Sequence, residues 1–182
     1  MKKWISMVAV CAVLLMAIGT SYAGKGPGTG PITLTDEVIE GLKQMRAEEK
    51  LAHDVYLEMY ENYNAQIFAN IMVSEQRHMD AVLSLLNKYG IEDPVAGMGA
   101  GDFGDLTIGE DTFQALYDGL IAQGETFAGA LDAGVQIEEL DIKDLEKLLD
   151  FVQNIPDIKN VYENLLDGSY NHLAAFESQL PE

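Results

Sequence analysis

A carboxylate and an imidazole lie three residues apart in a segment that otherwise has the apolar pattern of a buried helical face. Glu75 and His78 occur in SEQRHM, residues 74–79, and continue a series of apolar positions through Ile71 and Val82. Side chains three apart on a helix are neighbours, so the pair could bind one ion or two adjacent ions. Burying an unpaired carboxylate costs several kcal/mol, and a bound cation would offset that cost.

Three other segments also have polar residues in the middle of the face that is otherwise apolar. The spacing predicts that Glu49 points inward from the first segment, Glu138 and Asp141 from the third, and Ser169 and His172 from the fourth. A single Glu-x-x-His pair also occurs by chance on surface helices, so the prediction rests on agreement among four segments. Carboxylate and imidazole ligands without thiolate suit iron or manganese, and zinc is also compatible.

Polar neighbours of these positions have a different predicted place. Glu48 and Glu139 lie on other faces of their segments and are expected to face solvent. His53 follows Glu49 by four residues and could reach the site, but we expect it on the helix surface or behind the ligands. Tyrosines at helical spacing are expected in the core, although one near a metal could hydrogen-bond a ligand. They are Tyr56, Tyr63 and Tyr89.

Four long segments with helical period must position these groups. Their apolar residues recur at steps of three and four, and no alternating strand pattern is evident. We expect ordered structure to begin near Thr35, where TDEV provides a helix cap followed by acidic residues. The four stripes comprise Leu42, Met45, Ala52, Tyr56, Met59 and Tyr63; Phe68, Ile71, Val82, Leu85 and Tyr89; Leu145, Leu148 and Val152; and Ile158, Val161, Leu165, Phe176 and Leu180.

A long connection separates the second and third helical segments. Residues 90–109, GIEDPVAGMGAGDFGDLTIG, are too rich in glycine and proline for a helix, and residues 110–124 predict a short extra helix. Two tightly joined pairs on either side of one long connection are typical of an all-α four-helix bundle with a crossover. Residues 99–104 match Gly-x-Gly-x-x-Gly, but no strand precedes them, so a nucleotide site is not expected.

The N-terminal residues have the pattern of a cleaved secretory signal. Lys2 and Lys3 precede an apolar run that is too short for a stable membrane span, and small residues follow up to Ala23. We therefore expect a signal peptide at 1–23, a flexible tether at 24–34 and one bundle domain at 35–182, in a secreted or periplasmic protein. Cys11 is the single cysteine of the chain and falls within the signal.

The charge of the chain argues against nucleic acid as a partner. The formal net charge is −19 at pH 7, and two of the 11 basic residues lie in the expected signal peptide. An acidic field of this size repels polyanions and attracts cations. An ordinary solvated acidic surface that keeps a secreted protein soluble is the preferred explanation of the charge, so the charge does not define a function.

The chain resembles the ferritin-like di-iron carboxylate superfamily, in the style of rubrerythrin. The resemblance rests on EEKLAHDVY, SEQRHM, IEELDI and GSYNHLAAF, spans about residues 35–180, and is stronger still to a group of small secreted ferritin-like domains without characterised function. It implies a lone glutamate in the first and third helices, Glu49 and Glu138. It also implies a first Glu-x-x-His pair at Glu75 and His78, and makes His172 the histidine of the second pair.

One position departs from the superfamily pattern. Ser169 stands three residues before His172, where the pattern has glutamate. Asp141, one turn from Glu138 on the same stripe, could supply the missing carboxylate. Two metal ions are expected if it does, and a weaker second position or a single ion if it does not.

The resemblance implies a redox-active iron centre, and other functions stay open. Two iron ions could react with oxygen or peroxide or oxidise ferrous iron, which would make the protein a peroxidase-like or ferroxidase-like oxidoreductase. Electrons would come from elsewhere, because the mature chain lacks the cysteines that bind a second iron in rubrerythrin-like proteins. The alternatives are a non-catalytic module that binds iron, manganese or zinc, and a metal-free scaffold. A homodimer is compatible with the sequence, whereas a ferritin-type cage is not expected.

Overall fold

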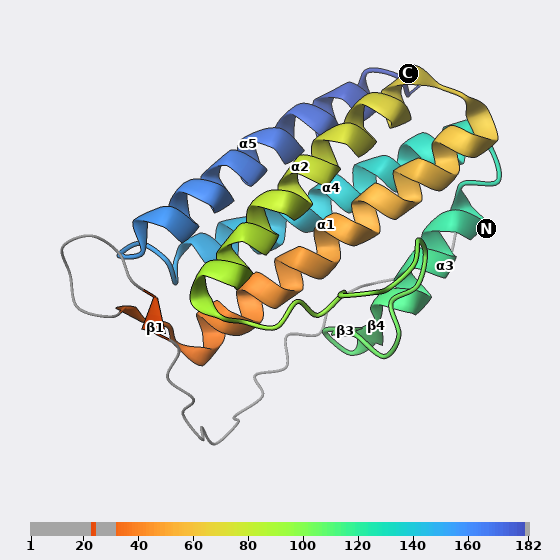
Figure 1. The fold of residues 1–182 in the computed structure, drawn as a ribbon. Helices are drawn as coiled ribbons and strands as arrows, with labels where there is room; N and C mark the ends of the chain where they lie inside the picture. The colour runs from red at the N-terminus through yellow and green to blue at the C-terminus, as the bar shows by residue number, and fades with distance from the viewer. Residues whose placement is uncertain (1–22, 25–31, 181–182) are drawn as a thin grey trace.

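The computed structural model describes residues 23–24 and 32–180, so residues 1–22 of the predicted signal peptide and most of the predicted tether lie outside the described residues. Four long helices form an all-α bundle (Figure 1): α1 (Asp36–Tyr63), α2 (Gln66–Tyr89), α4 (Phe127–Leu149) and α5 (Pro156–Glu177). A short helix, α3 (Phe113–Gln123), follows the long connection. The predicted bundle, crossover and extra helix are confirmed.

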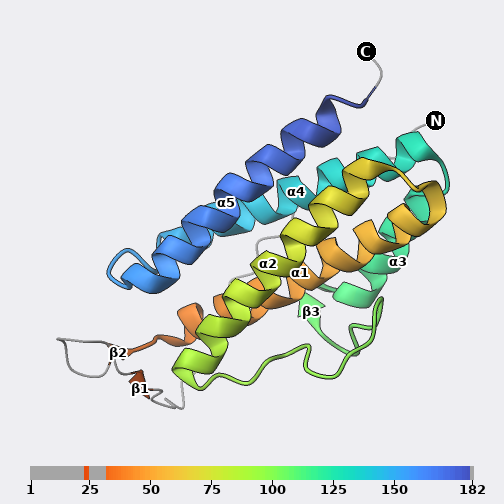
Figure 2. The same cartoon turned by 45° about the horizontal axis from the view of Figure 1, so that its top comes forward.

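Capping residues set the ends of the helices. The Thr35 side chain accepts a hydrogen bond from the amide of Val38 at 3.4 Å, as the TDEV sequence predicts for a helix start. Asn64, with φ of 49°, ends α1, and only Asn64 and Ala65 separate it from α2. Gly90, with φ of 69°, ends α2. A connection this short between α1 and α2 forces the two helices to run antiparallel, as Figure 2 shows.

In the described residues, short strands occur only before α1 and in the crossover between α2 and α3. β1 (Ala23–Gly24) pairs antiparallel with β2 (Ile32–Thr33), and β3 (Thr107–Ile108) pairs antiparallel with β4 (Asp111–Thr112). Two-residue strands have too few positions for an alternating pattern, so the sequence does not predict them. The end of the β3–β4 turn and β4 itself take up residues 110–112, so α3 begins later than predicted, at Phe113 behind its cap Thr112.

The hydrophobic core has two halves. One half includes Val55, Met59 and Phe68, and the other includes Leu42, Val82 and Leu165. Each long helix contributes apolar residues to both halves and polar residues at the boundary between them. The boundary residues are Glu48 and Glu49 of α1, Glu75 and His78 of α2, Glu138 and Asp141 of α4, and Ser169 and His172 of α5. A single polar layer thus crosses the middle of the bundle.

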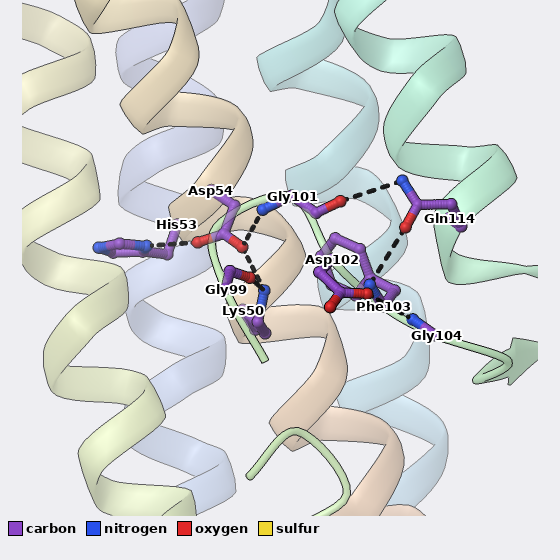
Figure 3. A network of polar contacts seen from close by, with 9 residues as sticks. All are labelled: Lys50, His53, Asp54, Gly99, Gly101, Asp102, Phe103, Gly104 and Gln114. Carbon is purple, nitrogen blue, oxygen red and sulfur yellow. Dashed lines mark hydrogen bonds and ion pairs between the residues drawn. The ribbon is translucent and has the colours of Figure 1, made fainter. Parts of the chain in front are cut away.

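The crossover is fastened along α1 by a polar network (Figure 3). Lys50 forms an ion pair with Asp54, donates to the carbonyl of Gly99 at 2.8 Å, and lies 4.3 Å from the centre of the Phe103 ring. The amide of Gly101 donates to Asp54 Oδ2 at 3.0 Å. These contacts bury the middle of α1 on a side that the helical spacing alone would leave exposed.

A second contact holds an earlier part of the crossover. The Arg46 guanidinium donates two hydrogen bonds to Asp93, at 3.2 and 3.1 Å. Arg46 is buried as well, so α1 is covered from Met45 to Ala52 without a break. Within the described ranges, no helix is both long enough and apolar enough to cross a membrane.

Candidate metal centre

Two groups of possible metal ligands meet in the polar layer. Glu49, Glu75 and His78 form the first group, and Glu75, Glu138 and His172 form the second. In each group, one ligand atom from every residue lies within 4.8 Å of the others. Glu75 belongs to both groups, so the two groups share a carboxylate.

The ligand atoms converge through the same nitrogen of both histidines. His78 Nδ1 lies 2.8 Å from Glu75 Oε2 and 3.2 Å from Glu49 Oε2. His172 Nδ1 lies 2.7 Å from Glu75 Oε1 and 3.5 Å from Glu138 Oε2. The two imidazole rings are 5.6 Å apart between centroids and nearly parallel, at 28°. Each oxygen of Glu75 therefore faces a different histidine.

The protein alone leaves these groups incompletely bonded. Glu49, Glu75 and Glu138 are each 1% exposed or less. Oε1 of Glu49, both oxygens of Glu75 and Oε2 of Glu138 have no aligned hydrogen-bond donor. Buried carboxylate oxygens normally have partners, and orphaned ones are costly. Oxygen and imidazole donors that converge in this way, with several oxygens lacking an aligned hydrogen bond, fit a metal cation, so the residues present are compatible with the implied metal.

Two further residues support the ligands from behind. The Tyr56 hydroxyl donates to Glu138 Oε1 at 2.6 Å, which fixes one oxygen and leaves the other toward the site. Gly168 leaves room for His78, because a Cβ at position 168 would lie 2.7 Å from Cε1 and Nε2 of that ring. Hydrogen bonds and close packing of this kind orient metal ligands.

The titration of the site favours a charged network when no metal is bound. Burial would raise the pKa of Glu75, but its contacts with His172 and His78 outweigh burial and lower that pKa to about 2. Burial would lower the pKa of His172, but contacts with Glu138 and Glu75 outweigh it and raise that pKa to about 9. A proton on His172 must leave before the nitrogen can bind a metal, so binding would release protons.

Burial disfavours the charged form of the other two carboxylates, Glu138 and Glu49. Burial raises the pKa of Glu138 to about 7, against the opposing contact with His172. Burial, followed by the charge of Glu75, raises the pKa of Glu49 well above its usual value. A bound cation would offset the repulsion between these buried carboxylates.

Asp141 lies near the two groups and belongs to neither of them. It is 1% exposed, and both of its oxygens lack a hydrogen-bond donor. Burial raises its pKa well above the usual value, and the charges of Glu49 and then Glu48 add to the effect. The role of fourth carboxylate ligand stays a prediction.

Ser169 is buried at the position where the superfamily pattern has glutamate. Its hydroxyl donates to the carbonyl of Leu165 at 3.1 Å, within its own helix. The hydroxyl is therefore engaged with the backbone and is not part of either ligand group.

The predictions for the neighbouring polar residues have mixed outcomes. Glu139 is exposed, as predicted. The prediction for Glu48 is wrong, because that residue is 1% exposed. Its face of α1 packs in the bundle, while the crossover and α3 cover other faces, so no side of the helix is left to solvent there. His53 contacts Asp54 at 2.9 Å between Nδ1 and Oδ1 and belongs to neither ligand group (Figure 3).

Sequence reasoning missed the space at Gly168 and the sharing of Glu75. The sequence GSYNH does contain a glycine one residue before Ser169, and a glycine inside a helix is a signal of close approach. No comparable signal in the sequence identifies which carboxylate lies between the two histidines, because that depends on how the helices are rotated.

Fold and site define a helical-bundle protein with buried carboxylate and histidine groups that could hold metal ions. The chain belongs to the family described as "Uncharacterized protein domain (DUF2202)", whose model matches residues 38–182. It is 49% identical over 148 residues to the uncharacterised protein MJ0754 of Methanocaldococcus jannaschii, covering 81% of this chain and 77% of that protein. The crystal structure of hypothetical protein MJ0754 from Methanococcus jannaschii is similar, with a TM-score of 0.74 and 47% identity over 84% of this chain and 83% of that one.

Proposed function

We propose that this protein is a ferritin-like dinuclear metal protein, and that iron in the shared site reacts with oxygen or peroxide or is oxidised there from the ferrous state. The observation that supports this most directly is the position of Glu75. Its two oxygens face two histidines, and each histidine has a further carboxylate, Glu49 or Glu138. A carboxylate shared in this way suits two ions a short distance apart.

The balance of charge also supports two cations. Glu49, Glu75 and Glu138 bring three negative charges into a layer whose histidines are neutral when they bind metal. Asp141 adds a fourth carboxylate close by. Two divalent ions would neutralise four carboxylates, whereas one would leave two buried negative charges uncompensated. The oxygen and nitrogen donors suit iron or manganese, and zinc is also compatible.

Bound ferrous iron would supply the electrons for this chemistry: two ions provide the two electrons that, with two protons, convert one peroxide into two waters. The residues of the chain bind and orient. Tyr56 holds Glu138, and Gly168 leaves space for the His78 ring. The two core halves exclude water above and below the layer. His78 and His172 are 12% and 11% exposed at their side chains, so a small oxidant would approach on the α2–α5 side.

A metal-binding module without catalysis is the alternative, and Ser169 favours it. Its hydroxyl bonds to Leu165, so one carboxylate of the superfamily pattern is absent. The weaker second position could hold iron, manganese or zinc without turnover, and the metal would then stabilise the bundle. If residues 1–23 are a secretory signal, as the sequence predicts, the mature protein would carry out either function outside the cytoplasm.

Iron loading without oxygen, followed by mixing with oxygen or peroxide, separates these functions. We expect the ferrous form to consume peroxide, with a change in visible absorption as iron is oxidised. Glu75→Gln should abolish the protein-dependent part of the reaction, and the exposed Glu139→Gln on α4 should keep it. Metal binding without any reaction with either oxidant would favour the non-catalytic module.

A further inference from the structure

Glu48 is a buried carboxylate that the proposed centre does not use. It is 1% exposed, and it belongs to neither ligand group. Oε1 accepts a hydrogen bond from Gln44 Nε2 at 2.7 Å, whereas Oε2 is buried without a partner. A buried carboxylate with an orphaned oxygen needs a reason, because its desolvation is not offset by the protein.

Gln44 connects Glu48 to the surface. Its Nε2 also donates to Asp144 Oδ2 at 2.8 Å, so one amide holds the carboxylates of Glu48 and Asp144 together across α1 and α4. Asp144 and Gln44 are partly exposed, in contrast to Glu48.

Asp141 is a third carboxylate, and it lies deeper in the bundle than Asp144. It lies one turn before Asp144 on α4 and one turn after Glu138, so the three carboxylates follow one face over about 9 Å of helix axis. Both Asp141 oxygens are buried and have no hydrogen-bond partner. The Tyr162 hydroxyl of α5 is also buried and has no hydrogen-bond partner.

We propose that Asp144, Glu48 and Asp141 form a route by which divalent cations pass from the surface to the metal centre between α1 and α4. The proposal rests on the proposed function, because the route has to lead to a metal site. A series of carboxylates surrounded by low-dielectric protein focuses its field and increases the rate at which cations enter. The orphaned oxygens provide successive positions for a cation, and the route opens on the side of the bundle opposite the histidines of α2 and α5.

Loading of divalent cobalt, followed by its visible absorption in stopped flow, tests the route. The full chain is used, as wild type, Glu48→Gln, Asp144→Asn and the control Glu139→Gln. Glutamine keeps the size of Glu48 and an oxygen that can accept from Gln44. We expect Glu48→Gln to slow loading about tenfold or more, Asp144→Asn to slow it less, and both to bind as many cobalt ions per chain as wild type.

The outcomes separate the route from the centre. Equal loading rates for Glu48→Gln and Glu139→Gln, with wild-type stoichiometry, would overturn the route alone. One fewer cobalt per chain in Glu48→Gln would also overturn it, since Glu48 would then be a ligand of a stably bound ion. A wild-type protein that binds no cobalt, manganese or iron would contradict the proposed function itself.

Discussion

Replacing Glu75 by glutamine is the most informative change in the polar layer. Glutamine keeps the size of the side chain and removes its negative charge. Because Glu75 belongs to both ligand groups, the change weakens both metal positions at once. We therefore expect wild-type protein to gain thermal stability from metal, and Glu75→Gln to gain little or none.

The size of the effect follows from ligand binding. A metal at 100 times its dissociation constant stabilises the folded state by about 2.7 kcal/mol per independent site, and so by about 5 kcal/mol for two. In a domain of this size, 1 kcal/mol shifts the melting temperature by about 2–4 °C. Metal should raise the wild-type midpoint by about 10–20 °C, and the rise should disappear in Glu75→Gln.

Circular dichroism melts with chelator and with added ferrous or manganous ion measure this difference. Glu139→Gln is the matched control, because it neutralises an exposed carboxylate on α4 beside Glu138. Each variant is compared with itself with and without metal, so a change in intrinsic stability does not affect the result. A metal-induced rise in Glu75→Gln equal to that of the control would refute the shared site.

Three other predictions concern the surroundings of the ligands. Gly168→Ala should displace the His78 ring and weaken one metal position about 10–100-fold, measured by metal titration; unchanged affinity would contradict the close contact. Tyr56→Phe should weaken metal binding at the position that includes Glu138 by a similar factor, because Glu138 loses the hydrogen bond that orients it; circular dichroism should show that the fold is retained. In chelator, stability should fall from about pH 5 to pH 9, because the raised pKa values of Glu138, about 7, and His172, about 9, keep more protons on the folded state than on the unfolded state there. Denaturant titrations across that range test the sign, and a rise with pH would refute it.

Local rules explain why the sequence predicts the bundle and its inward polar residues. Thr35 caps α1, and spacings of three and four residues place Glu75 and His78 on one buried face. These features depend on residues within a few turns of each other. The same rules brought Glu49, Glu138 and His172 to the layer, because long connected helices in a bundle align their apolar faces.

Features that depend on distant segments could not be predicted. The burial of Lys50 and Asp54 requires the backbone of Gly99 and Gly101, which the crossover brings onto α1. The spacing of Glu48 indicated an exposed face, but α1 has none at that point. The central place of Glu75 likewise depends on the relative rotation of α2 and α5, which a periodic pattern does not contain.

Metal content per chain tests the central claim most directly. The protein is loaded with ferrous iron without oxygen, freed of unbound metal and measured by elemental analysis, together with His78→Ala, His172→Ala and Glu75→Gln. We expect two irons per chain in wild type, about one in each histidine variant and close to none in Glu75→Gln. Two irons in every variant, or none in wild type, would contradict it.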